Sequence, residues 1–447
     1  MTKSGRGLVW FRRDLRLVDN PAWAAATRAH PDVLPVFVLD PHLLESSGPF
    51  RRDAMLGAVA ALDRALGGDL HLAAGDPVDE IPRLAAKLGA TAVFLNADVT
   101  PYAARRDAAV AAGLDVPVDA HWGTVVHAPG SITTADGTVP RVFSAFWRRW
   151  QERGLPTVEG PGHAHRVTLP GSARLPKGVT PSPDPRDRLD EFVAHHLADY
   201  PEQRDVPAVD GTSQLSIALK TGALGPTTAA RVAAGSGPKG EPWVRQICWR
   251  DWYAHLLAEQ PELVDHAQRP EYDGIAWRDD PEGLAAWQEG RTGVPIVDAG
   301  MRQLASTGWM HNRVRMITAS FLVKDLLIDW RHGERHFRRL LADGDVPQNV
   351  GNWQWVAGTG PDAAPYFRVF NPTLQSRKFD PGGEYLRRWI PELAGLDDTA
   401  IHEPSTLGPL ELAAAGVTIG ADYPEPIVDH KQARDRAVDA YKAARTA

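Results

Sequence analysis

Short apolar runs alternate with amphipathic stretches from residue 7 to residue 118. The apolar runs have the length of strands, and the stretches between them repeat their apolar residues with a helical period. The pattern predicts strands at 7–11, 33–39, 69–73, 92–95 and 115–118, with helices at 21–29, 52–66, 81–88 and 101–112. Such alternation is typical of a parallel sheet covered by helices on both faces. The sequence therefore predicts an α/β N-terminal parallel-sheet domain at 1–130.

A different pattern begins beyond this region. Residues 155–188 carry seven prolines and several glycines, which is typical of a long connector over a surface. Further on the pattern becomes helical, and the stretch 311–330 is apolar on most faces, as in a buried helical region. We therefore expect a connector at 131–189 and an all-helical C-terminal domain at 190–447.

Polar residues follow several of the predicted strands. They are Arg12, Arg13, Asp40 and Asp98. Ligands of parallel sheets bind beyond the carboxyl ends of the strands, so these side chains are candidate ligand contacts. No GxGxxG sequence follows the first strand, so a Rossmann dinucleotide site is not supported there.

Composition narrows the class of protein. The single cysteine, Cys248, excludes an intramolecular disulfide and a cysteine-rich zinc site, and it fits a reducing cytoplasm. The N-terminus has no apolar run long enough for a signal peptide, and no stretch approaches the ~20 apolar residues of a membrane helix. We expect a cytoplasmic protein that does not contact membranes and is a monomer.

Charge and tryptophan content bear on function. The net charge of −7 argues against a protein that coats DNA non-specifically, because affinity for phosphates comes from Lys and Arg. The stretch 311–340 nonetheless carries seven Lys or Arg against three Asp or Glu, so a local basic face could contact phosphate.

Ten of the 15 tryptophans lie between Trp243 and Trp389. They form either a large aromatic core or a site that uses aromatic rings for electron transfer or base stacking.

Two segments that are predicted to start or form helices also carry polar side chains that could bind a ligand. In 206–216, VPAVDGTSQLS, a glycine turn precedes small hydroxyls, which suits a phosphate at a helix start as well as a plain N-cap. In 243–253, WVRQICWRDWY, Gln246 and Trp249 share a helix face and Arg250 adjoins them. These side chains either line one pocket or pack the helix with aromatics.

Two later segments add charged groups. In 308–316, GWMHNRVRM, Asn312 and Arg315 share a helix face. Arg315 pairs either with a ligand or a carboxylate of the site, or with a surface carboxylate in a salt bridge that adds little stability. Asp343, Asp345 and Asn349 precede the sequence WQW at 353–355. Acidic residues around a glycine indicate a turn or a metal loop, but the spacing supplies no further metal ligands. We therefore expect no metal, and hydrogen bonding to a ribose or flavin edge fits better.

These segments together resemble the cryptochrome/photolyase family, most closely class I cyclobutane pyrimidine dimer photolyases. The resemblance extends from LVWFRRDLRL at 8–17 to YPEPIV at 423–428. Its most specific blocks are GVPIVDAGMRQL (293–304), TGWMHNR (307–313), SFLVKDLLIDW (320–330), WQW (353–355) and DAAPYFR (362–368). Several long blocks in the same order leave little room for chance.

The resemblance implies an α/β antenna domain, a connector and a helical FAD-binding catalytic domain. It assigns FAD contacts to Tyr200, Thr212, Ser213, Gln214, Leu215, Ser216, Trp243, Arg250, Arg315, Asp343, Asp345 and Asn349. The hydroxyls would lie near the diphosphate, and an Arg315–Asp343 pair would flank the isoalloxazine. The Asn349 amide would face the reactive N5 edge; plant cryptochromes are similar but carry Asp there, which favours repair over signalling.

The resemblance also implies a light-driven reaction. Trp277, Trp330 and Trp353 match a relay that carries an electron from near the surface to photoexcited flavin and generates FADH⁻, the repair-active form. Excited FADH⁻ would donate an electron to the dimer, the cyclobutane ring would split and the electron would return, as in a carbon–carbon lyase. The substrate would be UV-damaged DNA, whose lesion must flip out of the duplex and stack on aromatic walls. The matching lesion or DNA contacts are Arg204, Gln246, Trp249, Asn312, Arg313, Met316, Trp355 and Gln375.

One position departs from this pattern. Relatives that repair this dimer usually carry Glu where the chain has Gln246, which keeps a hydrogen-bond donor and acceptor but supplies no titratable proton. Photolyases of the (6-4) type and animal cryptochromes share the glutamine. A (6-4) photolyase, a cryptochrome-type blue-light photoreceptor and a plain electron-transfer flavoprotein therefore stay open as alternatives to dimer repair.

The resemblance extends to a second chromophore. The segment NADVTPY at 96–102 is similar to that of photolyases that use 8-hydroxy-5-deazaflavin as antenna, with Asp98 and Arg52 as matching contacts. The Asn-Glu pair usual in photolyases that use 5,10-methenyltetrahydrofolate is absent, so folate is the less favoured antenna. An empty or merely structural pocket is the remaining alternative.

Overall fold

The computed structural model describes residues 4–362, 365 and 367–446. Its internal contacts divide the chain into two compact units. The first runs to Ala198 and includes Ser213–Pro261, and the second comprises Asp199–Thr212 and the residues from Glu262 onward. The first unit contains a parallel sheet, and the second is helical, so the predicted fold class is confirmed. The limits predicted for the individual domains stay predictions.

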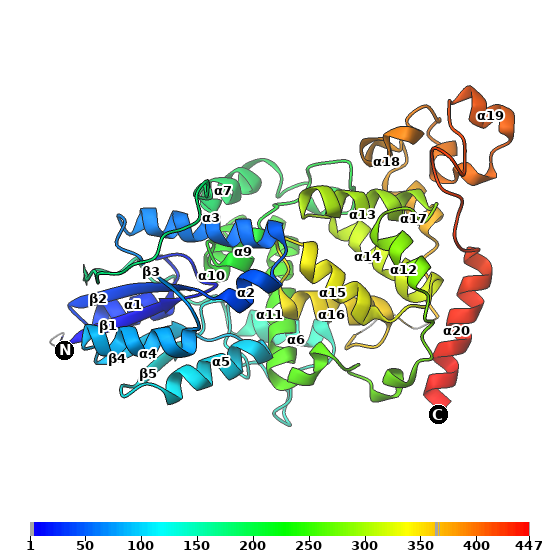
Figure 1. The fold of residues 1–447 in the computed structure, drawn as a ribbon. Helices are drawn as coiled ribbons and strands as arrows, with labels where there is room; N and C mark the ends of the chain where they lie inside the picture. The colour runs from blue at the N-terminus through cyan, green and yellow to red at the C-terminus, as the bar shows by residue number, and fades with distance from the viewer. Residues whose placement is uncertain (1–3, 363–364, 366, 447) are drawn as a thin grey trace. The chain divides into compact units, whose positions relative to one another are not determined.

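The sheet of the first unit has its strands in the order β3-β2-β1-β4-β5 (Figure 1). The strands are β1 (Arg6–Phe11), β2 (Asp32–Leu39), β3 (His71–Ala74), β4 (Ala92–Asn96) and β5 (Val118–His121). All the pairings are parallel. Central strand β1 is buried at every position after its first, as expected of a strand covered on both faces. The first four predicted strands are present with shifted ends, whereas β5 shares only Val118 with the strand predicted at 115–118.

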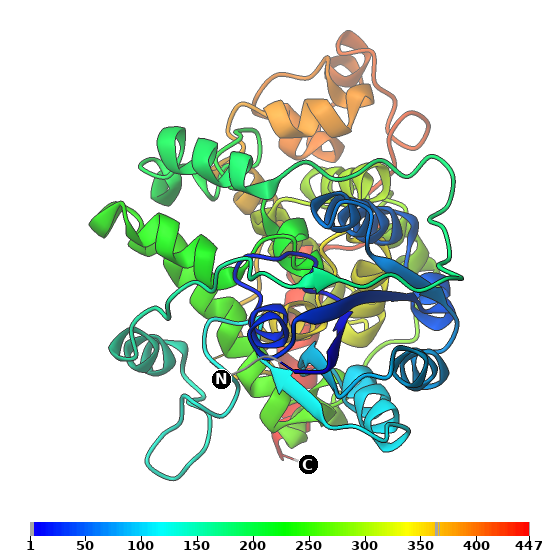
Figure 2. The same ribbon diagram turned by 90° about the vertical axis from the view of Figure 1, so that its left-hand side faces the viewer.

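Helices cover both faces of this sheet. Helices α1 (Pro21–Ala29) and α3 (Pro49–Ala65) pack on one face, and α4 (Pro77–Leu88) and α5 (Pro101–Ala112) pack on the other (Figure 2). Each of the four begins with a proline, and the side chains of Asn20, Asp76 and Thr100 cap three of them. A short helix, α2 (Pro41–Ser46), is capped by Asp40 and adds to the predicted elements.

The predicted connector contains more structure than its prolines indicate. It includes helix α6 (Phe143–Glu152), the start of α7 (Pro185–His195) and a two-residue strand, β6 (His165–Arg166), parallel to β2. Main-chain hydrogen bonds from Ala173 to Leu72 (2.7 Å) and from Ser182 to Gly57 (2.9 Å) fasten the rest. The connector is therefore attached along its length to the first unit.

The remaining helices follow in both units. Those of the first unit are α9 (Ser216–Thr221), α10 (Pro226–Ala234), η1 (Gly237–Lys239) and α11 (Glu241–Glu259). After α8 (Tyr200–Gln203) and η2 (Pro261–Val264), the chain forms η3 (Pro270–Gly274), α12 (Pro281–Gln288), α13 (Pro295–Thr307), α14 (Asn312–Ser320), η4 (Phe321–Asp325), α15 (Trp330–Leu340), α16 (Val346–Ala357), α17 (Pro372–Phe379), α18 (Glu384–Trp389), η5 (Pro391–Leu393), η6 (Ala400–His402), η7 (Pro404–Thr406), α19 (Pro409–Ala414) and α20 (His430–Thr446). Over the part of the chain that the structure describes, no helix is long and apolar enough to span a membrane.

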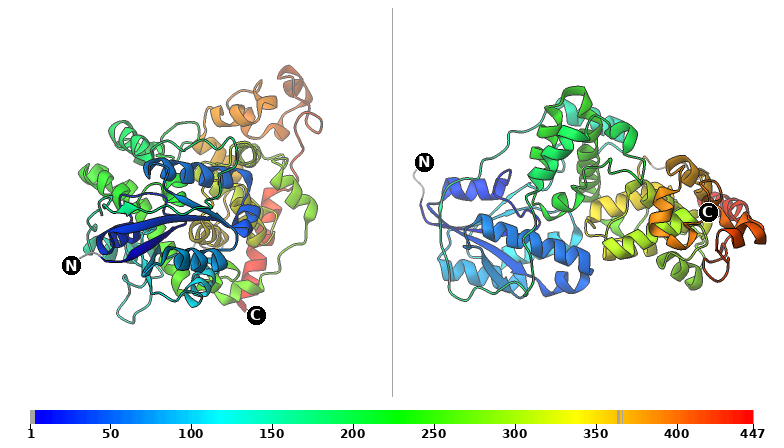
Figure 3. Two further views of the ribbon diagram at one scale, coloured as in Figure 1. Left: turned by 60° about the vertical axis from the view of Figure 1, so that its left-hand side comes forward. Right: turned by 90° about the horizontal axis from the view of Figure 1, so that it is seen from above.

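The stretch 311–330, predicted as one buried helical region, is buried but not continuous. Helix α14 passes into η4, a single π-helical turn, and Leu327 then takes the left-handed conformation with φ 54°. The chain restarts as α15, whose N-cap is Asp329. Helices α15 and α16 then pack side by side (Figure 3). Trp330 is therefore the first residue of a new helix and does not continue α14.

Gly222 ends α9 at φ 72° and lies directly against the main chain that follows β1. A Cβ atom here would overlap the Arg13 carbonyl oxygen and the Asp14 Cα. We expect Gly222→Ala to lower the free energy of unfolding by about 3 kcal/mol, from left-handed strain and overpacking. Urea unfolding measures the loss. Gly89→Ala is the control, since Gly89 has φ 64° but nothing within 4 Å of the added atom; equal losses would contradict the steric reason.

Candidate cofactor-binding site

The second unit contains the expected ion pair between Arg315 and Asp343. Arg315 Nη1 and Nη2 lie 3.1 and 2.9 Å from the two carboxylate oxygens, which is bidentate geometry. Arg315 Nε donates to Met310 O at 2.8 Å and fixes the guanidinium plane. The Asp343 side chain is 5% exposed. A rigid charged pair at the end of a short loop can orient a polar ring edge.

Asn349 lies one turn into α16 and is nearly buried. Its Nδ2 donates to both the main-chain oxygen and Oε1 of Glu334, each at 2.9 Å. Both partners are acceptors, so they select the Nδ2 end of the amide and direct Oδ1 away from Glu334. Burial raises the pKa of the Glu334 carboxyl, and Arg338 opposes this. The amide is therefore held with its acceptor end presented.

Glu334 is a residue that the sequence reading missed. It belongs to α15, in which Trp330, Gly333, Glu334 and Phe337 are buried. That spacing places Glu334 on the same helix face as the two aromatic residues. The sequence signal that could have identified Glu334 is a single acidic residue on the apolar face of a helix whose other charged residues are basic.

The three tryptophans expected to form a relay all lie in the second unit. Trp353 and Trp330 are 2% and 1% exposed, whereas Trp277 is half-buried. A Cβ at Gly333 of α15 would overlap the Trp353 ring, so the helix that begins at Trp330 packs directly on Trp353. Trp353 also contacts Phe337 and Trp287 at centroid distances of 5.0 and 6.2 Å.

Trp277 contacts a residue of the C-terminal helix. Its ring meets Tyr441 of α20 edge-on, with centroids 6.0 Å apart. Neither Tyr441 nor Trp287 was among the candidates, because both contacts join segments distant in sequence.

Further candidates of the second unit occupy α8, α14 and their surroundings. Asn312 and Met316 share one face of α14, with Nδ2 3.8 Å from Sδ. Arg313 lies 3.0 Å from Asp205 and covers the Phe379 ring at 4.3 Å. Any phosphate would therefore compete with Asp205 for Arg313. The remaining candidates are Asp345, which is buried at the start of α16, Tyr200, which is buried under Arg204, and Thr212, Trp355 and Gln375, which are half-buried.

The first unit holds the candidates of helix α11. Trp249 stacks on Phe143 with centroids 3.7 Å apart and an angle of 12°. Gln246 Nε2 donates to Pro242 O at 3.2 Å, one turn earlier in the helix. Trp243 is buried and contacts Phe192 at 5.7 Å. The helix is therefore packed by aromatic side chains, while the role of the half-exposed Gln246 and Trp249 in lining a pocket stays a prediction.

Arg250 and the segment Ser213–Ser216 are linked in the first unit. Arg250 donates to the main-chain oxygens of Thr124 and, at 3.1 Å, of Leu219 in α9. Helix α9 starts at Ser216 with Leu215 as its N-cap and no side-chain cap bond. The N-cap reading of the Thr212-Ser213 pair is therefore wrong, because the helix begins later. Gln214 has φ 53°, so the segment makes a sharp turn.

Of the two candidate antenna residues, Asp98 follows the carboxyl end of strand β4 in the first unit, at the same edge of the sheet as the polar residues that follow β1 and β2. Asp98 pairs with Arg13 at 3.2 Å, and Tyr102 donates to Asp40 at 2.7 Å. Burial opposes ionisation of Asp98, but the charges of Arg13 and Lys220 outweigh it and lower the pKa of the carboxyl. Arg12 contacts Asp107 and the Asn96 oxygen. Arg52 is exposed on α3.

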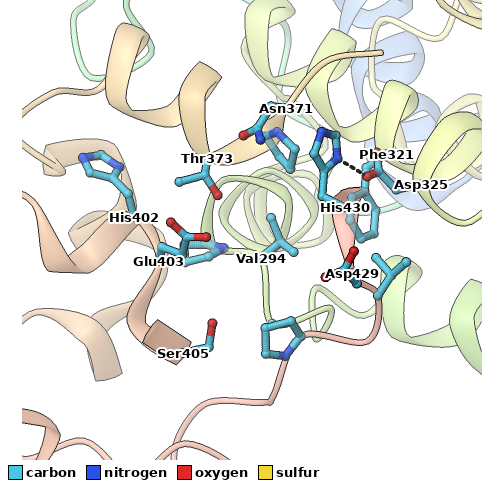
Figure 4. A pocket seen from close by; sticks show the side chains of 15 residues that line it. Val294, Phe321, Asp325, Asn371, Thr373, His402, Glu403, Ser405, Asp429 and His430 are labelled. Carbon is cyan, nitrogen blue, oxygen red and sulfur yellow. Dashed lines mark hydrogen bonds and ion pairs between the residues drawn. The ribbon is translucent and has the colours of Figure 1, made fainter. Parts of the chain in front are cut away.

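A separate pocket of about 390 Å³ lies within the second unit (Figure 4). It is lined by residues that include Val294, Asn371, Glu403 and His430, and the Asp325–His430 pair (2.6 Å) lies at one side of it. None of the predicted site residues lines it. Among the described residues, no group of His, Cys, Asp or Glu is arranged to hold a metal ion. Residues 363, 364 and 366 of the DAAPYFR block lie outside the described residues.

Comparisons with known proteins bear on this arrangement. Residues 7–162 match the family described as DNA photolyase, and residues 243–443 match the FAD binding domain of DNA photolyase. The deoxyribodipyrimidine photo-lyase of Escherichia coli is 40% identical over 480 aligned positions, which cover 98% of this chain and 98% of that protein.

Two solved structures are also similar. A bacterial class III photolyase from Agrobacterium tumefaciens has a TM-score of 0.91 and 38% identity, covering 100% of this chain and 99% of that one. A cryptochrome from Synechocystis sp. has a TM-score of 0.90 and 28% identity, covering 98% and 100%. With both family matches and an identity of 40% over nearly the whole length, this chain belongs to the DNA photolyase family.

Proposed function

We propose that this protein uses FAD and blue light to split cyclobutane pyrimidine dimers in DNA. The observation that carries the proposal is the fixed amide of Asn349, whose acceptor end is presented by Glu334. An acceptor there suits a flavin that carries a proton on N5. Relatives of similar length from Escherichia coli and Streptomyces griseus are named deoxyribodipyrimidine photo-lyases, which supports the same activity.

The donor set of the second unit fits an isoalloxazine ring. One edge of that ring has an N–H donor between two carbonyl acceptors. Carboxylates at Asp343 and Asp345 can accept from the donor, and the Arg315 guanidinium can donate to a carbonyl. All three side chains belong to the second compact unit, and the two carboxylates are buried.

Arg315, Asp343, Asp345 and Asn349 would hold the FAD, and the reduced cofactor would contribute the light-excited electron for ring opening. The protein's own residues do the rest. Trp249 in the first unit and Trp355 in the second each have a half-exposed indole ring, and an aromatic ring of this kind is a surface on which a flipped-out base can stack. Asn349 keeps a neutral acceptor at the flavin edge. Trp353, Trp330 and Trp277 would pass electrons from an external reductant in solution to flavin that has become oxidised, and would themselves end unchanged.

The orientation of Asn349 can be tested at Glu334. Glu334→Leu removes the side-chain acceptor and leaves only the main-chain oxygen, so the amide can turn over. We expect FAD reduced by light to reoxidise in air several-fold faster than in the wild type, since about 1–2 kcal/mol of hydrogen bonding is lost. Absorption spectra after illumination measure the rate. Glu289→Leu, at an exposed acid of the same unit, is the control and should leave the rate unchanged.

The lesion preference can be tested at Gln246. Repair is measured under blue light on DNA that carries either a defined cyclobutane dimer or a defined (6-4) lesion. We expect turnover on the cyclobutane dimer alone, and we expect Gln246→Glu to raise the quantum yield about twofold or more through a stronger, charge-assisted hydrogen bond. Turnover only on the (6-4) lesion would replace the proposal with the alternative that Gln246 suggests. No turnover on either would reject repair.

We also propose a second chromophore in the first unit, with 8-hydroxy-5-deazaflavin favoured over 5,10-methenyltetrahydrofolate. Asp98 would accept a hydrogen bond from it, since the Arg13 pair keeps the carboxyl ionised. Arg52 is accessible for a further contact. The absorption spectrum of the purified protein identifies the chromophore, and a spectrum of FAD alone would contradict the proposal.

A further inference from the structure

A buried carboxylate, Asp251, follows Arg250 in helix α11 and has no part in the steps above. It is fully buried and accepts hydrogen bonds from Val126 N (3.0 Å), His127 N (3.0 Å) and Trp150 Nε1 (2.9 Å). Burial raises the pKa of the Asp251 carboxyl to about 6, against the effect of these donors. The carboxylate thereby fastens the loop 124–127 to the helix.

The same loop holds Arg250. The Thr124 oxygen accepts from Arg250 Nη1, while Nη2 reaches Leu219 O in α9. A second guanidinium, that of Arg16, makes a parallel bridge. It donates to Gly123 O at 2.6 Å and to Gly222 O at 3.0 Å, directly after α9. Two arginines therefore clamp the end of α9 to the loop that Asp251 fixes.

Helix α9 has only six residues and is about 9 Å long, so fixing its end also fixes its start. The segment Ser213–Ser216 at that start carries FAD contacts that the family resemblance assigns. The geometry points to Asp251 as a positioning residue that sets the place of Arg250 and of the Ser213–Ser216 segment through the loop 124–127. The inference rests on the proposed FAD site and names a residue that acts on it without touching it.

A buried aspartate can also serve the fold alone, and Asp298 provides the comparison. It is fully buried in the second unit, and burial raises the pKa of its carboxyl. It accepts from Thr292 N and Oγ1 (2.7 Å each), Gly293 N (3.0 Å) and Tyr423 Oη (2.6 Å). None of these partners is a proposed cofactor contact. Asp298→Asn is therefore a matched control for Asp251→Asn.

The test uses the FAD-loaded protein. Release of FAD is followed by its fluorescence below the unfolding temperature, and urea unfolding is measured on the same samples. Both Asn variants should unfold at lower urea, but only Asp251→Asn should release FAD about tenfold faster, with Asp298→Asn within about twofold of wild type. Unchanged release from Asp251→Asn, or equal acceleration in both variants, would overturn the inference.

Two further variants keep the test decisive if Asp251→Asn does not fold. Trp150→Phe removes one donor and should speed FAD release about threefold; an unchanged rate overturns the inference. The double variant Arg250→Lys with Trp150→Phe should speed FAD release by less than the two single effects combined, because both residues act through the loop 124–127. Strictly additive effects on the release rate would overturn the role of that loop. A wild type that holds FAD but repairs no DNA defeats the proposed function and leaves this test intact, whereas a wild type without FAD defeats both.

Discussion

Replacing Trp353 by phenylalanine is expected to slow light-driven reduction of bound FAD by about 100-fold, or about 2.7 kcal/mol in the barrier. Trp353 is buried against α15, the helix that begins with Trp330. Phenylalanine keeps an aromatic ring but is far harder to oxidise than indole. Loss of the oxidised-flavin absorption under blue light, with an external reductant, measures the rate. Enzyme reduced chemically beforehand should repair DNA at the wild-type rate, and loss of both activities would contradict the assigned role.

Trp287→Phe is the matched control for this prediction. Trp287 is fully buried and its ring centroid is 6.2 Å from that of Trp353, but it has no place in the predicted relay. Its Nε1 donates to Thr318 O at 3.0 Å. Trp287→Phe and Trp353→Phe each replace a large buried indole by a phenyl ring, so the two variants are comparable in packing. We expect photoreduction to remain near the wild-type rate. An equal slowing in the two variants would show that the electron passes through Trp287.

Arg315→Met is expected to abolish FAD retention and to lower the free energy of unfolding by about 3 kcal/mol. The substitution leaves the Asp343 carboxylate, 5% exposed, without its bidentate partner. The proposed flavin would lose a cationic donor at the same time. The ratio of FAD to protein after purification and urea unfolding of the apoprotein measure the two effects.

Arg302→Met provides the control for Arg315→Met. Arg302 is 26% exposed, close to the 23% of Arg315, and pairs with Glu392 at 2.5 Å. Its partner is 23% exposed, so water screens the unpaired charge and the loss should be about 1 kcal/mol. FAD should remain bound. Loss of FAD from both variants would indicate general destabilisation in place of a cofactor contact.

Strands β1, β2 and β4 could be predicted because they are buried on both faces and therefore appear as apolar runs, whereas β5, with the sequence VDAH, has no buried residue. Strand β6 could not be predicted, since His165 and Arg166 are polar and exposed and their pairing with β2 depends on main-chain groups. The stretch 311–330 shows a related limit. Its apolar character predicts burial correctly, but a π-helical turn and the left-handed Leu327 depend on packing that a periodic pattern does not encode.

The candidate site also contains features that the sequence predicts and features that it does not. The Arg315–Asp343 pair could be predicted from matching motifs, and the structure contains it. The stack of Trp249 on Phe143 joins residues more than a hundred positions apart, so neither helical spacing nor local composition indicates it. Glu334 and Asp251 were missed for another reason. A charged residue usually lies at the surface, and only its place on a buried helix face reveals that it holds other groups in position.

The attachment of the connector has a consequence for chain entropy. A free segment of this length would behave as one long flexible loop. The pairing of His165 and Arg166 with β2 and the hydrogen bonds at Ala173 and Ser182 divide its stretch from His165 to Ser182 into intervals of fewer than ten residues. Closing several short loops in sequence restricts the chain at each step. We therefore expect the prolines here to act chiefly on the unfolded chain, by reducing the number of conformations that folding must exclude.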